Sequence, residues 1–328
     1  MSMTQLRLSI VICTYNGAAY LQQQLDSLLA QTRLPDEIVM SDDGSADASQ
    51  SILQAFAERA RGLGIAVQLW SNPGNLGYVE NFSKALQQAT GDVLFLCDQD
   101  DVWRPDKLAL MATRFDNDPK LLLLHSDARL VDAQGVSLGG SLFDALRLTS
   151  EEKRTIHDGR AFEVVLRRSF VTGATAALRR ELTGMALPVA PDWIHDEWLT
   201  AVAAAFGPMD FIDEPLIDYR QHDANQIGMR RRTLMMKWHD LLLSRGQMLI
   251  AEAKRWQRLE DFLAQARGSS DRAAQARHRR VHFEQRVAIG RLPRYRRLLP
   301  ILREARAGSY RRYGTGGRSM LRDLLRHD

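Results

Sequence analysis

Short apolar runs alternate with segments of helical apolar spacing through the first third of the chain. The runs predict strands, because they are rich in β-branched and other apolar residues and end at turn residues; they cover residues 8–13, 37–40, 65–70 and 93–97. Between them, three segments have apolar residues at helical spacing and predict helices: one through Leu21, Leu25, Leu28 and Leu29, one over residues 48–61 and one over residues 79–89. This alternation predicts an α/β fold, with a mainly parallel twisted sheet and helices on both faces.

The fourth run ends directly on three carboxylates, Asp98, Asp100 and Asp101. In an extended backbone, Asp98 and Asp100 point to the same side, at the sheet edge where open α/β folds bind their ligands. Hard oxygen ligands suit Mg²⁺ or Mn²⁺, and such a cation suits a diphosphate. Taken alone, an Asp-x-Asp sequence is more often a solvated acidic turn after a strand.

Two further carboxylates, Asp42 and Asp43, follow the second run and should lie beside the same cleft. Carboxylates at this position can accept hydrogen bonds from ribose hydroxyls or a base N–H. The turn after the first run, residues 14–17, contains no glycine-rich phosphate loop, and none occurs elsewhere in the chain. The sequence therefore argues against a dinucleotide-binding dehydrogenase and favours phosphate binding through a cation.

The composition is that of a globular protein: 328 residues, 45% hydrophobic and 26% charged. No apolar run approaches bilayer length, and the N-terminus lacks a secretory signal, so we expect a cytoplasmic protein. Cys13 and Cys97 fall inside predicted buried strands and are expected to be reduced core residues.

Charge divides the chain into two regions. Residues 230–328 hold 25 Lys and Arg against 9 Asp and Glu, whereas residues 1–229 hold 19 against 31. We therefore place a domain boundary near Gly228, between a nucleotide-binding α/β domain (1–228) and a basic, mainly helical region (229–328).

The basic region combines arginines with apolar residues at helical spacing: Trp238, Leu241, Leu242, Met248, Trp256, Leu259, Phe262 and Leu263. A basic amphipathic segment can lie on an anionic leaflet, which would suit an acceptor carried on a membrane lipid and a position on the inner face of the cytoplasmic membrane. A solvated helical hairpin and a homo-oligomer contact are the alternatives. No nucleic-acid partner is expected, since the chain contains no recognisable binding module.

Five motifs in order resemble glycosyltransferase family 2; they occupy residues 11–17, 41–45, 75–78, 91–101 and 103–108. The resemblance extends over roughly residues 6–225. It is strongest to a bacterial branch that includes rhamnosyltransferases of surface-polysaccharide synthesis, whose later motifs are matched by residues 170–173, 194–198 and 219–222.

This resemblance implies a GT-A fold. It also implies transfer of a sugar, with inversion, from a nucleoside-diphosphate donor to a hydroxyl of a glycan or lipid-linked acceptor. Matched residue by residue, it assigns Asp98 and Asp100 to the metal–diphosphate motif and Asp42 to the base or ribose. It assigns Asp196 to the general base, and it places three residues in the nucleoside pocket: Thr14, Tyr15 and Asn16.

Glu197 is an alternative base because it is acidic and adjacent to Asp196. An apolar stripe through Ile194, Trp198 and Val202 places Asp196 about 200° from Ile194 on a helix, away from the packed face. Glu197 falls nearer the border of the stripe. Asp196 is therefore the predicted base, although an acidic first turn could also simply complement the helix dipole.

Other residues are predicted around the reacting groups. His222 and Gln221 follow a predicted strand over residues 211–219 and are expected to contact the diphosphate or the metal. Gly173 is expected to allow close backbone approach to substrate or simply to form a turn, with His195 as a further acceptor or diphosphate contact.

A second sequence, His125-Ser126-Asp127, resembles part of a catalytic triad, but adjacent residues do not predict one. We expect it to be a strand end lining the cleft. A nucleotidyltransferase and a non-catalytic nucleotide-sugar-binding protein are the alternative functions for the chain, because both would use the same nucleotide-binding features.

Overall fold

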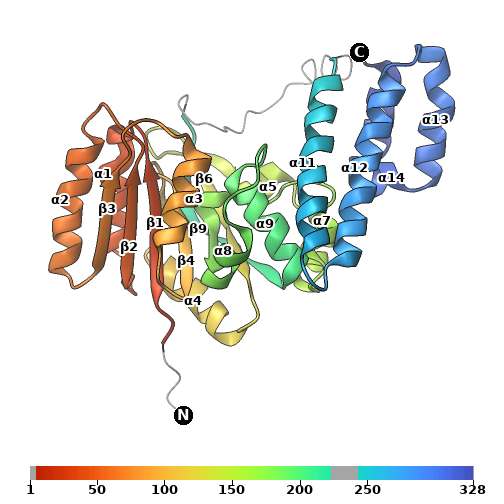
Figure 1. Ribbon diagram of the computed structural model, residues 1–328. Helices are drawn as coiled ribbons and strands as arrows, with labels where there is room; N and C mark the ends of the chain where they lie inside the picture. Colours follow the sequence, from red (N-terminus) through yellow and green to blue (C-terminus); the bar gives the residue numbers. More distant parts are fainter. Residues whose placement is uncertain (1–4, 223–242, 328) are drawn as a thin grey trace. The chain divides into compact units, whose positions relative to one another are not determined.

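The computed structural model describes residues 5–222 and 243–327, which form two compact units (Figure 1). The described part of the first unit comprises residues 5–161, 170–189 and 194–222. That of the second comprises residues 162–169, 190–193 and 243–327. The predicted boundary near Gly228 lies outside the described residues.

Four parallel strands form one half of the sheet in the first unit, in the order β3-β2-β1-β4. Their bounds are close to those predicted: β1 Leu8–Thr14, β2 Glu37–Asp42, β3 Ala66–Ser71 and β4 Val93–Cys97. Strands β1, β2 and β4 are buried along their whole length, as expected for strands covered by helices on both faces. Because the strands are parallel, their carboxyl ends meet at one edge.

The other half of the sheet is mixed and continues as β4-β8-β6-β9-β5. Strand β8 is antiparallel to both of its neighbours, β6 and β9 are parallel, and β7 adds to β6. The bounds are β5 Val102–Trp103, β6 Leu123–Val131, β7 Ser137–Ser141, β8 Ala176–Arg179 and β9 Met209–Arg220. The predicted α/β fold is confirmed, and the antiparallel pairs lie in this half.

The helices of the first unit are α1 Ala18–Leu29, α2 Ser49–Gly62, α3 Tyr78–Gln88, α4 Lys107–Asn117, α5 Leu142–Leu146, α6 Ser150–His157, α8 Arg180–Ala186 and α9 His195–Phe206. Helices α2 and α3 match the predicted segments within one residue, and α1 ends at the predicted Leu29. A 3₁₀ turn, η1, covers Gly173–Thr175. The core joins β1, β2 and β4 to the apolar faces of α1, α2 and α4, and it includes Cys97. Cys13 and Cys97 are buried and form no disulfide, as predicted.

The sequence His125-Ser126-Asp127 lies inside β6, and all three residues are buried. The expectation of a strand end lining the cleft is therefore wrong, because the apolar run that precedes these residues continues through them as a nine-residue strand. The His125 ring packs against the rings of Phe143, Phe170 and Phe211.

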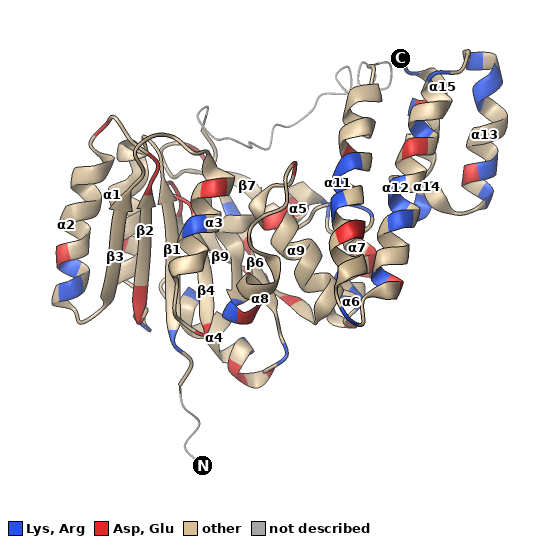
Figure 2. Ribbon diagram, viewed as in Figure 1, with Lys and Arg blue, Asp and Glu red and all other residues tan. Residues whose placement is uncertain are grey.

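The described part of the second unit is helical, as predicted. Its helices are α7 Ala161–Val165, which begins on the last residue of a first-unit segment, α11 Gly246–Gln265, α12 Ser270–Gly290, α13 Arg294–Arg306, α14 Ser309–Arg312 and α15 Gly317–Leu325. Figure 2 shows Lys and Arg at positions along α12 and α13. No helix within residues 5–222 and 243–327 is both long and apolar enough to span a bilayer.

The predicted apolar positions of the basic region are only partly buried. Trp256, Leu259 and Leu263 are buried, whereas Met248 is exposed. Trp238, Leu241 and Leu242 lie outside the described residues. The Trp256 ring packs against Trp193, which belongs to the same unit.

Candidate active site

The carboxyl ends of β1, β2 and β4 bring the predicted nucleotide-binding residues to one edge of the sheet. Thr14 ends β1 opposite Asp42, the last residue of β2, and Thr14 Oγ1 donates a hydrogen bond to Asp42 Oδ2 at 2.9 Å. Asp98 follows the last residue of β4, which is also paired with β1. The structure thus brings Thr14, Asp42 and Asp98 together, as the parallel pairing predicts.

Asp42 is a buried carboxylate held by several donors. Its oxygens accept hydrogen bonds from Ser45 Oγ at 2.6 Å, Ser45 N at 2.9 Å and Ser71 Oγ at 3.2 Å, besides that from Thr14. Burial opposes ionisation, but these hydrogen bonds outweigh it and lower the pKa of Asp42 below its ordinary value. Asp42 is therefore a fixed, ionised acceptor.

Asp43 is also buried, and its observed partners lie in the loop before α3. Its Oδ1 accepts hydrogen bonds from Asn72 Nδ2 at 3.0 Å and Leu76 N at 2.9 Å, while Oδ2 accepts one from Gly77 N at 2.9 Å. Gly77 has a φ of 86°, a conformation that favours glycine. Asp43 thus fixes the loop beside Asp42, and its predicted contact with nucleotide stays a prediction.

The turn after β1 is held by a residue that the motif analysis did not single out. Gln99 Oε1 accepts a hydrogen bond from Tyr15 N at 2.8 Å, and Gln99 Nε2 donates one to Tyr15 O at 3.2 Å. A Cβ on Gly17 would lie 2.3 Å from Gln99 Oε1, so a larger residue there would displace the Gln99 side chain. Asn16 has a φ of 48°, and its Oδ1 accepts a hydrogen bond from Ala46 N at 2.9 Å. Gln99, the middle residue of Asp-x-Asp, therefore fixes the turn carrying Tyr15 and Asn16.

Burial and mutual repulsion disfavour ionisation of the carboxyl groups after β4. Burial, together with the charges of Asp100 and Asp196, raises the pKa of Asp98 to about 7. Burial and the charges of Asp100 and Asp98 raise the pKa of Asp101 well above its ordinary value. Asp101 Oδ1 accepts a hydrogen bond from Arg220 N at 2.9 Å, whereas its buried Oδ2 has no hydrogen-bond partner in the described part of the chain.

Lys107 is a buried cation beside this segment. Its Nζ donates a hydrogen bond to Ala174 O at 2.9 Å and lies 3.7 Å above the Trp103 ring. Burial lowers the pKa of Lys107 to about 7, although the charges of Asp101 and Asp98 favour its protonated form. At neutral pH, Lys107 therefore offsets only part of the negative charge.

The end of β9 brings His222 to the acidic segment, and its predicted contact with diphosphate or metal stays a prediction. His222 Nε2 lies 2.8 Å from Asp100 Oδ2, and the imidazole stacks on the Tyr20 ring with 4.7 Å between ring centroids. Arg220 Nε donates a hydrogen bond to Asp100 O at 2.7 Å. Gln221 Nε2 donates one to Arg220 O at 3.3 Å, so the observed contact of the Gln221 side chain is with backbone.

Asp100 and His222 offer one oxygen and one nitrogen ligand to a cation. Among the residues that the structure describes, no group of three or more His, Cys, Asp or Glu side chains is arranged to hold a metal. A Mg²⁺ or Mn²⁺ ion would therefore take most of its ligands from phosphate and water, which is typical of Mg²⁺ sites that bind substrate phosphates. A bound cation would relieve the repulsion that raises the pKa of Asp98 and Asp101, so the acidic segment fits the presence of such an ion.

The predicted base lies in the first turn of α9, against η1. Asp196 Oδ2 accepts a hydrogen bond from Gly173 N at 3.0 Å, and Oδ1 accepts one from Glu197 N at 2.7 Å. A Cβ on Gly173 would lie 3.2 Å from His195 Nε2 and 3.5 Å from Asp196 Cβ. The structure thus brings Gly173, His195 and Asp196 together, and Asp196 is near enough to Asp98 for its charge to raise the pKa of that carboxyl.

His195 is buried beneath this turn and stacks on Phe82 of α3, with 4.3 Å between ring centroids. Burial lowers the pKa of His195, and neither ring nitrogen has a hydrogen-bond partner among the described residues. The contact orients the first turn of α9. The predicted contact of His195 with acceptor or diphosphate stays a prediction.

The helix α9 is buried over a wider face than the predicted stripe. His195 and residues 198–204 are all buried, whereas Asp196 and Glu197 are both half-buried. Exposure therefore does not separate the two candidate bases. The hydrogen bond from Gly173 and the proximity to Asp98 favour Asp196.

Relatives of known sequence cover about two thirds of the chain. An uncharacterised glycosyltransferase of Nostoc sp. is 29% identical over 224 residues, which is 67% of this chain and 66% of that protein. An uncharacterised protein of Mycobacterium tuberculosis is 29% identical over 220 residues, 66% of this chain and 59% of that protein. The chain thus spans 59% to 66% of the length of these curated relatives.

Two solved structures share the fold. The crystal structure of S. aureus TarS 1–349 in complex with UDP-GlcNAc is 18% identical, with a TM-score of 0.54 and coverage of 94% of this chain and 89% of that chain. The mannosyltransferase PcManGT from Pyrobaculum calidifontis, in complex with GDP-Man and Mn²⁺, is 20% identical, with a TM-score of 0.51 and coverage of 94% and 77%. The first unit therefore has the predicted GT-A fold. Residues 9–183, more than half of the sequence, match the family described as Glycosyl transferase family 2, and the chain belongs to this family.

Proposed function

We propose that the protein is an inverting, metal-dependent glycosyltransferase that moves a sugar from a nucleoside-diphosphate donor to a hydroxyl of a glycan or lipid-linked acceptor. The observation that carries the proposal is the arrangement of Asp100, His222 and Asp196 around one sheet edge, beside the half-buried carboxyl of Asp98. We place the reaction in bacterial cell-surface polysaccharide synthesis, with a rhamnosyl or other hexosyl group as the sugar transferred.

Asp196 is the proposed general base. A sugar hydroxyl is a poor nucleophile at neutral pH, and a carboxylate that accepts its proton during attack contributes about 10² to 10⁴ in rate. The hydrogen bond from Gly173 N fixes the Asp196 carboxylate, and each oxygen keeps a second acceptor position for the acceptor hydroxyl. Glu197, the alternative base, shares the same turn of α9.

The donor nucleoside is proposed to lie against the carboxyl ends of β1 and β2. Asp42 supplies an ionised acceptor for ribose hydroxyls or a base N–H, and Thr14 holds its orientation. Tyr15 and Asn16 are exposed on the turn that Gln99 fixes, and they are available to line the pocket. The GDP-Man and UDP-GlcNAc complexes of the two structural neighbours support a nucleotide sugar as donor.

Asp100 and His222 are the residues that would hold Mg²⁺ or Mn²⁺, with Asp98 beside them. When bound, such an ion stabilises the negative charge that develops on a leaving diphosphate. The Mn²⁺ in the PcManGT complex supports this assignment. Arg220 donates hydrogen bonds to Asp101 and to the carbonyl of Asp100, and these hold the Asp100 and His222 side chains in contact.

Product analysis tests the proposed reaction. The purified protein is incubated with Mn²⁺, a panel of nucleotide sugars and a lipid or glycan extract as acceptor source. We expect release of a nucleoside diphosphate and formation of a glycoside whose anomeric configuration is opposite to that of the donor. Release of pyrophosphate would instead identify a nucleotidyltransferase, and donor binding without turnover would identify a binding protein.

The basic region from residue 229 onward is proposed to serve the acceptor side of this reaction at the inner face of the cytoplasmic membrane. Its excess of arginine supports contact with an anionic surface. A homo-oligomer contact is the competing role for the same region.

A further inference from the structure

Helix α13 presents large apolar side chains to solvent. Tyr295 is 78% exposed, Leu299 70%, Leu298 53% and Leu302 38%. The opposite face is buried and consists mainly of Arg297 and Ile301. This is the reverse of an ordinary amphipathic helix in a globular protein, which turns its apolar side chains toward the core.

The exposed apolar residues form one stripe. At about 100° per residue, Tyr295, Leu298, Leu299 and Leu302 fall within an arc of about 100° on the helix surface. Exposed arginines flank the stripe. Arg296 and Arg303 lie on one side of it and Arg294 on the other, and Arg306 is the last residue of the helix. A stripe of Leu and Tyr bordered by cations is the pattern of a helix that lies in a membrane interface.

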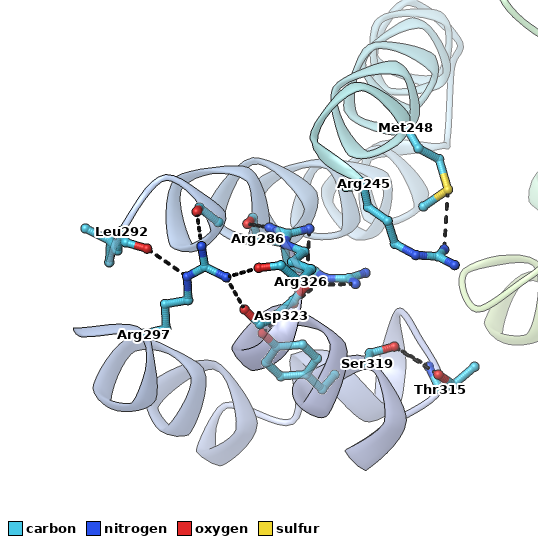
Figure 3. A network of polar contacts seen from close by, with 11 residues as sticks. Arg245, Met248, Arg286, Leu292, Arg297, Thr315, Ser319, Asp323 and Arg326 are labelled. Atoms are coloured by element: carbon cyan, nitrogen blue, oxygen red, sulfur yellow. Dashed lines mark hydrogen bonds and ion pairs between the residues drawn. The ribbon is translucent and has the colours of Figure 1, made fainter. Parts of the chain in front are cut away.

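The buried face of α13 is fixed by a polar network, so the apolar stripe has a defined direction (Figure 3). Arg297 donates hydrogen bonds to Leu292 O at 2.7 Å and Arg326 O at 2.8 Å. Nearby, the buried carboxylate of Asp323 accepts hydrogen bonds from Arg286 Nε at 2.7 Å and Tyr310 Oη at 2.8 Å. Turning the stripe inward would break these buried charged contacts, which are costly to lose.

The charge around the stripe is of one sign. Residues 291–327 contain 11 arginines and two acidic residues, Glu304 and Asp323. Both acidic side chains are engaged within the unit, Glu304 with His282 Nδ1 at 2.8 Å and Asp323 in the network around Arg286. The surface of this described segment therefore combines apolar and positively charged groups.

We propose that α13 docks the protein on an anionic lipid bilayer, with Tyr295, Leu298, Leu299 and Leu302 in the interface and the arginines on lipid phosphates. Apolar burial and attraction to anionic headgroups add in this arrangement. A second copy of the chain is a poorer occupant, because two such faces would oppose arginine to arginine with no exposed carboxylate from this segment between them. The proposal rests on the proposed function in one respect: docking on a bilayer would bring the active site to a lipid-linked acceptor.

Vesicle flotation of the full chain tests the proposal. We expect co-flotation with phosphatidylcholine vesicles that contain about 30% phosphatidylglycerol, little with phosphatidylcholine alone, and release at high salt. The double variant Leu298→Ser/Leu299→Ser should lower the affinity at least about tenfold because it removes apolar area from the interface. Arg296→Gln/Arg303→Gln should lower it mainly for anionic vesicles.

The matched control is Leu63→Ser/Val136→Ser, which removes two apolar side chains that are 54% and 62% exposed in the first unit. This variant should float like the unchanged protein. Absence of flotation with anionic vesicles, or equal flotation of all variants, overturns the proposal. Loss of a dimer in Leu298→Ser/Leu299→Ser during sedimentation, without loss of flotation, would assign the stripe to a second copy.

The same samples separate this proposal from the proposed function. Donor-dependent rise of the melting temperature reports on the nucleotide site and should be unchanged in the α13 variants, which also shows that they are folded. Flotation without any donor effect would leave the docking intact and argue against the transferase. A donor effect without flotation would support the transferase and overturn the docking.

Discussion

His222 Nε2 lies 2.8 Å from Asp100 Oδ2, although 122 residues separate them in the sequence. The contact depends on β9, whose final residue, Arg220, donates its backbone N–H to Asp101 and its Nε to the carbonyl of Asp100. Two hydrogen bonds from one residue thus fix the distance between the imidazole and the carboxylate. The contact brings together one oxygen and one nitrogen, the pair that we propose as metal ligands.

We predict that His222→Gln and Asp100→Asn each abolish most metal-dependent donor binding. A ligand at 100 times its Kd stabilises the folded state by about 2.7 kcal/mol, which is readily seen as a rise in melting temperature. With a nucleoside diphosphate and Mn²⁺, the unchanged protein should show this rise, and EDTA should remove it. Asp106→Asn, which breaks an ion pair with Arg104, is the control and should keep the rise. An equal rise in all variants would place the metal elsewhere.

Asp196→Asn should retain donor binding and lose about 10² to 10⁴ in the rate of transfer, because the amide cannot accept the hydroxyl proton. The amide oxygen can keep the hydrogen bond from Gly173 N, but the amide nitrogen cannot accept the one from Glu197 N, so a loss of about 1 kcal/mol in stability is expected. Steady-state kinetics with donor and acceptor varied separately should show the loss in kcat.

Glu197→Gln is the matched control for that variant, since it makes the same change one residue along α9. It should keep most of the transfer rate. Full activity in Asp196→Asn together with a large loss in Glu197→Gln would reverse the assignment of the base.

Lys107→Met should destabilise the protein by about 1 to 3 kcal/mol, because it removes a buried donor and the cation that interacts with two neighbouring carboxyl groups. The affected groups are Asp98 and Asp101, whose charges interact with the Lys107 ammonium. The variant also loses the hydrogen bond to Ala174 O, next to the residue that holds Asp196, so transfer should slow as well.

Urea unfolding and kcat measure the two effects of Lys107→Met. Lys84→Met, on the exposed side of α3, is the control and should change the free energy of unfolding by less than about 0.5 kcal/mol. Equal stability of the two variants would show that Lys107 does not stabilise the acidic segment.

The sequence predicted the parts of the site that depend on strand ends and motifs. Asp42 and Asp98 could be placed together because parallel strands share one carboxyl edge, and His222 because a strand was predicted just before it. The antiparallel direction of β8 could not be predicted, because a four-residue strand has too few residues for its sequence to indicate which way it runs in the sheet.

The supporting residues could not be predicted, because their roles arise from contacts across the fold. Gln99 bonds to Tyr15 across 84 residues, and Lys107 bonds to Ala174 across 67 residues. Nothing in their local spacing indicates these partners. The same holds for His125, which is adjacent to Ser126 and Asp127 in sequence but packs against aromatic rings.

His125 should make the protein sensitive to acid independently of its function. Burial lowers the pKa of His125 to about 3, from an ordinary value of 6.5, and neither ring nitrogen has a hydrogen-bond partner in the described residues. Folded His125 therefore stays neutral between these two values, whereas the unfolded chain takes up a proton below pH 6.5. Stability is fully present above pH 6.5 and is lost as the pH falls toward 3.

We therefore predict that His125→Leu flattens the dependence of stability on pH. Below pH 6.5, the free energy of unfolding of the unchanged protein should fall more steeply than that of the variant, by about 1.4 kcal/mol per pH unit. Urea unfolding at a series of pH values gives both slopes. His278→Leu, at an exposed position of α12, should keep the slope of the unchanged protein. Identical slopes for all three proteins would mean that His125 is protonated in the folded state, contrary to its burial among Phe143, Phe170 and Phe211.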